Sequence, residues 1–259
     1  MSLEFGRRPA RYTPGSVQRA FLFNKVLADL GTPPASSDDY VSAVDTATGG
    51  DWGMDGNDTE GDCTIADSSH QVMLRTANCS KIVIPTTAQC LAIYNSLTGG
   101  QDTGLDELTV IQYLGKTGFL GHKVDAAANV DPANLNHIKW TIQLYGACRL
   151  GINFVDSMMD QFNKGLPWDV VPGAKLTGDG HDVPLVRYIT VGQTTQYFVV
   201  TWAKMIPVTE AFLLWQIDGT PVVEEAHAEC STDFIKATGA SPAGYDHDAL
   251  MGYLGAIAN

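Results

Sequence analysis

A cysteine stands at the start of a helical-looking segment in residues 57–70, NDTEGDCTIADSSH. Unsatisfied N–H groups and the positive dipole end of a helix N-terminus both favour a thiolate, so Cys63 is a candidate nucleophile. Gly61 permits the close backbone turn that such a helix start needs. The Asn57 amide and the backbone N–H of Cys63 would together form a two-donor oxyanion hole. The alternative interpretation of Cys63 is a buried structural thiol, the usual state of a lone cysteine.

A cysteine nucleophile needs a base, and two histidines are candidates. His70 lies seven residues further along the same helix, a rise of about 10 Å, which is too far for a hydrogen bond to the thiol. We therefore expect His70 to be a packing or supporting residue. His181 follows a glycine-rich turn and opens a strand in GDGHDVPLVRYITVG. A histidine there is held rigidly and can face the cysteine from another part of the fold, so His181 is the predicted base.

Helical patterns fill the first half of the chain, and β-branched and aromatic runs of strand length follow. Glycine- and aspartate-rich residues 38–56 look like a loop. This order of elements predicts an α+β protein with a helical lobe and an antiparallel β lobe. The expected helices cover residues 18–30, 63–78, 91–98, 105–116 and 134–145, and the expected strands cover residues 149–155, 184–191, 196–202 and 212–217.

The residues around Cys63 and His181 resemble the papain-like cysteine peptidases. In that family an amide residue precedes the cysteine by six positions, and a glycine precedes it by two. Asn57 and Gly61 match these positions, with asparagine in place of the usual glutamine. The family's histidine begins a strand and has a tyrosine seven positions later, as His181 has Tyr188.

The resemblance extends from about residue 51 to about residue 212 in the family's order. Residues 137–154 resemble the helix and strand before the family's histidine, and residues 196–202 resemble the strand after it. It implies a single papain-like α+β domain over residues 1–259. The expected parts are a helical lobe (about 1–145) with Cys63 on its central helix, a β-rich lobe (about 146–218) and a helical tail (about 219–259).

The chain departs from the family pattern at several positions. Trp202 occupies the place of the third catalytic residue, an asparagine, and an indole N–H can only donate. We therefore expect Trp202 to shield His181, while Thr201, a backbone carbonyl or a distant acid orients it. Thr64 follows the cysteine where papain has tryptophan. The residues before Asn57, about fifty, are too few for an inhibitory propeptide of the usual size.

The resemblance implies hydrolysis of an amide or ester bond through an acyl-enzyme formed by a Cys–His dyad. Cys63 would attack the carbonyl, His181 would move the proton, and Asn57 would hold the oxyanion. One alternative is a catalytically inactive papain-like module that binds a peptide or partner. A second alternative is an esterase or acyltransferase, because esters demand less protonation of the leaving group than amides do.

The composition excludes several partners. The chain has a net charge of −13 and no cluster of Lys and Arg, which argues against nucleic acid. No stretch is long and apolar enough to span a membrane. The five cysteines include no C-x-x-C pair, so we expect core thiols at Cys79, Cys90, Cys148 and Cys230 and a reducing, cytoplasmic location. The expected partner is a peptide or a small ester or amide, with no cofactor.

A rival interpretation concerns residues 51–62, DWGMDGNDTEGD, which resemble a calcium loop with acids at positions one, five and twelve and glycine at six. Gly53 offers no side-chain oxygen at position three, and Asp62 is shorter than the usual glutamate at position twelve. Near the C-terminus, residues 223–230, VEEAHAEC, carry metal-ligand residue types without a helical ligand pair. We expect that segment to be solvated and the remaining histidines to lie on the surface (His122, His137, His227 and His247).

Overall fold

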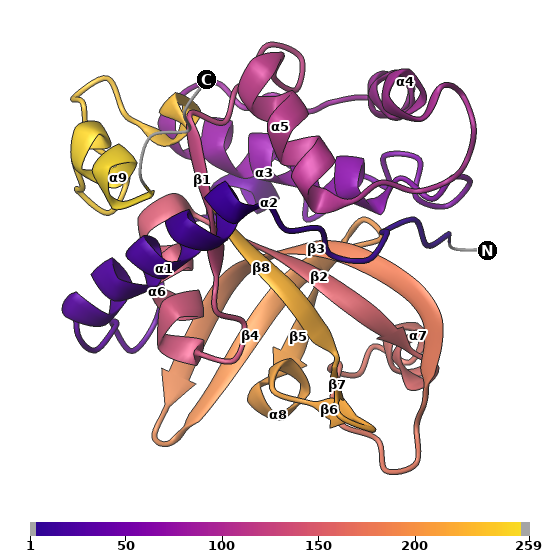
Figure 1. Cartoon of the computed structure of the whole chain (residues 1–259). Coiled ribbons are helices and arrows are strands. Elements are labelled where there is room, and N and C mark those ends of the chain that lie inside the picture. The colour runs from indigo at the N-terminus through magenta and orange to yellow at the C-terminus, as the bar shows by residue number, and fades with distance from the viewer. Residues whose placement is uncertain (1–3, 255–259) are drawn as a thin grey trace.

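The computed structural model describes residues 4–254, and it describes their side chains except for residues 14–21. The helices between residues 41 and 116 form a helical layer above a twisted antiparallel sheet, and the helices at residues 14–29 and 135–145 lie at the side of the sheet (Figure 1). The helices up to residue 145 are α1 (Pro14–Asp29), α2 (Val41–Thr48), α3 (Cys63–Cys79), α4 (Thr87–Thr98), α5 (Glu107–Lys116) and α6 (Leu135–Tyr145), and the later ones are α7 (Ser157–Asn163), α8 (Glu210–Leu213) and α9 (His247–Leu254). None of the described helices is long and apolar enough to cross a membrane.

The main sheet has six strands in the order β1-β8-β2-β3-β4-β5, and all neighbours are antiparallel. β3 pairs with β2 on one side and with β4 on the other, so residues of β3 lie in the middle of the sheet. A separate two-stranded hairpin is formed by β6 and β7. The strands are β1 (Ala126–Val130), β2 (Cys148–Val155), β3 (Leu176–Val191), β4 (Thr194–Thr201), β5 (Lys204–Thr209), β6 (Gln216–Ile217), β7 (Thr220–Pro221) and β8 (Val223–Cys230).

The helix α3 is buried over most of its length although many of its residues are polar. Its buried polar groups are paired with the sheet through Arg75, which contacts Glu229 of β8 at 3.2 Å, and above all through Arg149 of β2. The Arg149 guanidinium lies 2.7 Å from Glu229 of β8, 2.6 Å from Asp182 of β3 and 3.4 Å from Asp67 of α3. It also donates to the carbonyl oxygen of Thr64 on α3. This arginine therefore ties the first turns of α3 to three strands.

The predicted α+β class and the order of most elements are confirmed, but residues 38–56 are not all loop. Val41 and Val44 of α2 are buried at helical spacing, and Gly49 ends the helix in the left-handed conformation at φ 71°. The predicted strand at residues 212–217 is mostly wrong. The Thr209 side chain accepts from the Phe212 N–H and starts the one-turn helix α8 instead.

The expected helical tail from residue 219 is also wrong in its first part. Residues 223–230 form β8, which inserts between β1 and β2, and of the described tail only α9 is an α-helix. The charged residues of β8 made the segment look solvated. The structure buries Glu225, His227 and Glu229 and gives each an ion-pair partner. Buried paired charges have the same residue types as solvated charges, so composition alone does not separate them.

Replacement of Arg149 should strongly destabilise the protein. Arg149→Met leaves the carboxylates of Asp67 and Asp182 buried without their cation and leaves Glu229 with Arg75 alone, and breaking a buried ion pair in this way costs about 3–5 kcal/mol. Urea unfolding followed by circular dichroism measures the change. Lys164→Gln is the matched control, because its pair with Asp160 is exposed and worth less than about 0.5 kcal/mol. Equal unfolding free energies for the two variants would refute the role given to Arg149.

Candidate active site

Cys63 is the first residue of α3, as predicted, and only 1% of its surface is exposed. Its sulfur interacts with the backbone N–H groups of Gly6, in the N-terminal segment, and Asp182, on β3. The Asp62 side chain makes no capping hydrogen bond to the helix. The thiol is therefore enclosed between the start of α3, the middle of β3 and the first described residues of the chain.

His181 precedes Asp182 on β3, so the strand that contacts the thiol also carries the predicted base. The His181 Nε2 atom lies 2.8 Å from the Thr201 hydroxyl oxygen. The Nδ1 atom is buried and has no hydrogen-bond partner among the described residues. One ring nitrogen is thus held by the hydroxyl of Thr201, one of the three orienting groups that the sequence left open, and the other nitrogen has no partner among the described residues.

The indole of Trp202 stacks on the His181 ring, with 4.6 Å between centroids and 18° between planes. Trp202 and Ala203 form the two-residue turn between β4 and β5, with φ values of 45° and 65°. The left-handed conformation is unfavourable for a bulky residue, so the fold holds Trp202 there against a local cost. The Ala203 carbonyl accepts from the Trp52 N–H at 3.1 Å, which joins this turn to the loop before α3.

His70 of α3 contacts the loop before this helix and holds it in place. The spacing along the helix had indicated that His70 is too far from the thiol for a hydrogen bond. His70 Nε2 lies 3.0 Å from the carbonyl oxygen of Gly53 and 3.6 Å from the Asp55 carboxylate. The same loop carries Asn57, whose side-chain nitrogen donates to the carbonyl oxygen of Glu4 at 3.2 Å and to that of Glu60 at 3.4 Å. The proposed oxyanion donor is therefore already engaged with a backbone carbonyl of the N-terminal segment.

Residues 4–8, hereafter the N-terminal strap, cross the site in an extended path between the helical layer and β3 (Figure 1). The strap makes backbone hydrogen bonds with both sides: Glu4 N–H donates to Asn57, Arg7 N–H to Gly180, Arg8 N–H to Leu105, and Leu105 N–H to Gly6. A Cβ atom on Gly6 would overlap the Gly61 carbonyl, so the strap fits only with glycine at that position. No pattern in the sequence had predicted such a strap.

Enclosure changes the protonation of the predicted pair. Burial raises the pKa of the Cys63 thiol well above its ordinary value, and burial lowers the pKa of His181 to about 3. The aromatic ring of Phe5, in the strap, packs edge-on against His181 and Trp202. The thiolate expected from the helix dipole is therefore not the favoured form here. With the strap in place the pair is a neutral thiol and a neutral imidazole.

The strap also inserts a charge between the lobes. The Arg7 guanidinium is 3.2 Å from Glu107 of α5, 2.6 Å from Glu224 and 2.7 Å from Glu225 of β8. These three glutamates are called the acidic cluster below. His227, expected on the surface, is buried 3.1 Å from Glu107 and 3.0 Å from Glu225. Although burial opposes it, hydrogen bonds to these two carboxylates raise the pKa of His227 to about 9.

Within the described part of the chain, one set of three metal-ligand side chains comes together at ligand distances, formed by Glu107, Glu225 and His227. The acids of the suggested calcium loop form no such set. The acid at position five, Asp55, instead lies 3.6 Å from the Nε2 atom of His70. The calcium interpretation is therefore not supported by the arrangement of these acids.

The other histidines divide between surface and interior. His137 is buried, contrary to expectation, and its Nδ1 lies 3.0 Å from the Asn24 side-chain oxygen. His122 and His247 are partly exposed. The described cysteines are all free, and Cys90, Cys148 and Cys230 are buried as expected, whereas Cys79 is half-buried.

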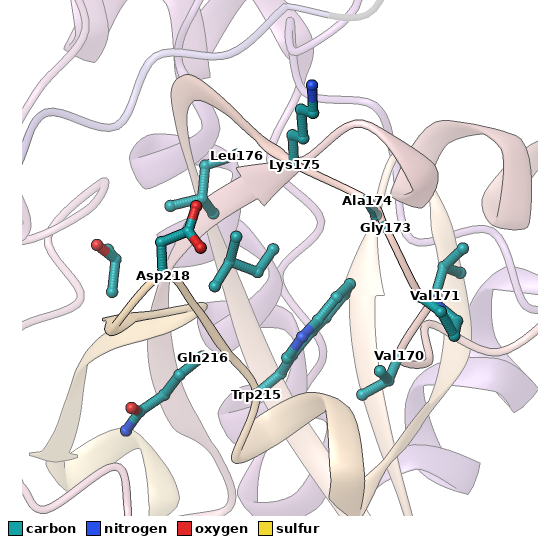
Figure 2. A pocket seen from close by; sticks show the side chains of 12 residues that line it. Val170, Val171, Gly173, Ala174, Lys175, Leu176, Trp215, Gln216 and Asp218 are labelled. Carbon is teal, nitrogen blue, oxygen red and sulfur yellow. The ribbon is translucent and has the colours of Figure 1, made fainter.

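A hollow of about 720 Å³ lies elsewhere, between the segment 170–176 and the β6–β7 hairpin. Figure 2 shows the Trp215 indole standing between Val170 and Leu176 at its wall. None of the residues expected to do chemistry lines this hollow. The chemistry-bearing residues instead gather beneath the N-terminal strap.

The sequence pointed to Cys63, His181, Thr201, Trp202 and Asn57 as site residues, and the structure gathers all five around the strap. Sequence reasoning missed the strap and the acidic cluster. One signal in the sequence could have indicated the cluster. The N-terminal arginines are the only closely spaced basic residues in an acidic chain, so a buried acidic partner could have been expected for one of them.

No protein-family model matches this sequence, and no curated protein matches it significantly. The structure is similar to xylellain, a cysteine protease from Xylella fastidiosa, with 14% identity, a TM-score of 0.56, and coverage of 88% of this chain and 96% of that one. It is also similar to procathepsin B S9 from Trypanosoma congolense, with 11% identity, a TM-score of 0.53, and coverage of 88% of this chain and 86% of that one. A third similar structure is digestive procathepsin L 3 of Tenebrio molitor larval midgut, with 9% identity, a TM-score of 0.54, and coverage of 88% of this chain and 75% of that one. The chain thus has the papain-like fold that its sequence pattern predicted.

Proposed function

We propose that this protein is a cysteine hydrolase that cleaves peptide bonds with Cys63 as nucleophile and His181 as base. One observation carries the proposal: the thiol at the start of α3 contacts β3 next to a histidine whose far nitrogen is held by the Thr201 hydroxyl. Activation of a cysteine by a fixed histidine is a recurrent solution for acyl transfer. The similarity to cysteine proteases supports the same class of chemistry.

The proposed reaction has two stages. His181 takes the thiol proton as the Cys63 sulfur attacks the substrate carbonyl, and the Asn57 amide and the Cys63 N–H donate to the developing oxyanion. The leaving amine receives the proton from His181, and a thioester remains on Cys63. Water, deprotonated by His181, then attacks the thioester, which releases the acid and restores the thiol. Thr201 is a positioning residue, because it acts through the His181 ring.

The strap favours a peptide over a small ester as the substrate. An extended segment of backbone already lies across Cys63. Its N–H groups donate to the carbonyl oxygens of Asn57 and Gly180, and it both donates a backbone hydrogen bond to Leu105 and accepts one from it. These contacts recognise a main chain, which a small ester does not possess. A catalytically inactive peptide-binding module would use the same contacts, and turnover distinguishes the two. For turnover, the strap must leave the site.

Displacement of the strap should expose this activity. Gly6→Ala places a methyl group against the Gly61 carbonyl, so we expect the strap to detach and the hydrolysis of a fluorogenic peptide panel to rise at least about tenfold over wild type. Gly252→Ala is the control, because a Cβ there meets nothing within 4 Å. Activity in Gly6→Ala that survives a second substitution, Cys63→Ala, would rule out the nucleophile. A folded Gly6→Ala that turns over nothing would favour the binding module.

The reactivity of Cys63 should change in parallel. In wild type, burial holds the thiol protonated, and the thiolate is the reactive form, so iodoacetamide at pH 7 should label Cys63 more slowly than half-buried Cys79. In Gly6→Ala the order should reverse, with Cys63 labelled about tenfold faster than before. Peptide mass spectrometry of time points measures both rates. Unchanged Cys63 labelling in Gly6→Ala would show that the strap does not control access to the thiol.

The hydroxyl of Thr201 should matter for catalysis rather than for binding. In the Gly6→Ala background, Thr201→Ala removes one hydrogen bond to His181, and we expect kcat to fall about fivefold to tenfold with little change in KM. Thr201→Ser keeps the hydroxyl and should retain kcat within about twofold. Steady-state kinetics on one good peptide provides both constants. A loss of kcat that is equal in the alanine and serine variants contradicts a positioning role.

A further inference from the structure

The acidic cluster holds a guanidinium with a geometry that distinguishes arginine from other cations. Two different nitrogens of Arg7 are used: Nε meets Glu107 at 3.2 Å, while Nη2 meets Glu224 at 2.6 Å and Glu225 at 2.7 Å. The carboxylates therefore converge from α5 and β8 on two adjacent nitrogens of one planar group. A lysine ammonium, a single point charge, cannot reach all of these positions in the same way.

The space for this group is built into the sheet. Gly151 of β2 pairs with Asp182 of β3 and Glu225 of β8, so it lies beside the site. A Cβ atom at position 151 would overlap both the Arg7 side chain and the Glu107 carboxylate. The backbone of Gly151 is not in the left-handed region, so glycine is not needed there for its φ angle. The missing side chain instead leaves the volume that the guanidinium fills.

The charges of the cluster require a cation. Glu107 and Glu225 are buried, and Glu224 is partly exposed. The Arg7 guanidinium contacts all three carboxylates, whereas the His227 ring contacts only Glu107 and Glu225. When the strap leaves, all three carboxylates lose this guanidinium. Buried carboxylates without a cationic partner are costly, so the emptied site favours a new positive group from solution.

Neighbouring residues of the strap contact the Cys63 thiol and the acidic cluster. Gly6 is the strap residue at the Cys63 sulfur, and Arg7, its neighbour, donates its N–H to the Gly180 carbonyl next to His181. A peptide that follows this path and inserts an arginine into the cluster therefore places neighbouring backbone over Cys63. The site for the side chain and the site for chemistry belong to one binding path.

We propose that the acidic cluster is the specificity site of this protein, that it selects peptides with an arginine close to the cleaved bond, and that Arg7 is an internal occupant of that site. The proposal rests on the proposed peptidase function and adds the class of its substrate. Glu107, Glu224 and Glu225 are the specificity-determining residues, and Gly151 provides the room for the side chain.

The test compares arginine with citrulline, which has the same shape but no charge. In the full-length Gly6→Ala variant, kcat/KM is measured for pairs of fluorogenic peptides that carry either residue at one of the two positions before the cleaved bond. We expect arginine to be favoured by about 10- to 100-fold in at least one position, since hydrogen bonds to charged groups are strong. Glu224→Gln, at the partly exposed member, should reduce this ratio several-fold. Turnover with equal rates for both residues overturns the proposal.

A binding measurement separates this proposal from the proposed function. A labelled peptide of residues 4–10, EFGRRPA, is titrated into the full-length Gly6→Ala/Cys63→Ala variant, with fluorescence anisotropy as the readout. We expect the peptide with citrulline in place of the first arginine to bind at least about tenfold more weakly. Selective binding without turnover by the Gly6→Ala variant would leave the specificity site standing while the hydrolase function fails. Equal binding of both peptides removes the specificity site.

Discussion

The buried Arg149 guanidinium holds together the parts of the molecule on which the site depends. It sits on β2 and contacts α3 through Asp67 and Thr64, β3 through Asp182, and β8 through Glu229. Cys63 is the residue before Thr64, and His181 is the residue before Asp182. The same arginine therefore sets the separation of the two residues assigned to the chemistry. A hydrophobic contact could not fix this arrangement as tightly, because apolar packing has no preferred direction.

The position of the strap explains the difference between the expected and observed states of the thiol. A helix N-terminus stabilises a thiolate by a modest amount, which is greatest where the charge is partly solvated. Burial opposes the charged form more strongly than the dipole supports it, and here Phe5 and Gly6 complete the burial. The electrostatics of the pair therefore depend on a segment more than fifty residues away in sequence. In this conformation burial favours the neutral form of both members of the proposed catalytic pair.

Local patterns predicted α1, α3, α4, α5 and α6, the strands β2, β3 and β4, and the residues near the thiol, because each is encoded within a few neighbouring positions. Cys63 opens a helix two residues after Gly61. His181 was expected to open a strand, but it lies inside β3, which begins five residues earlier at Leu176, beside the residue that touches the cysteine. The acidic cluster has no such local signature. Arg7 meets Glu107 across 100 residues and Glu225 across 218, so only the folded chain brings them together. Charged residues in β8 had been assigned to the surface for the same reason, since their partners are distant in sequence.

Under the proposed function, the strap is a tethered ligand that competes with peptide substrates for the same site. A ligand joined to its site by a short linker acts at an effective concentration in the millimolar range, whatever the amount of protein present. Arg11 shortens the free part of this tether, because it pairs with Asp106 and donates to Thr109 at the start of α5. A free peptide must therefore outcompete a local concentration that dilution does not lower. The measured affinity for any substrate would then equal its intrinsic affinity reduced by the fraction of molecules in which the strap is detached.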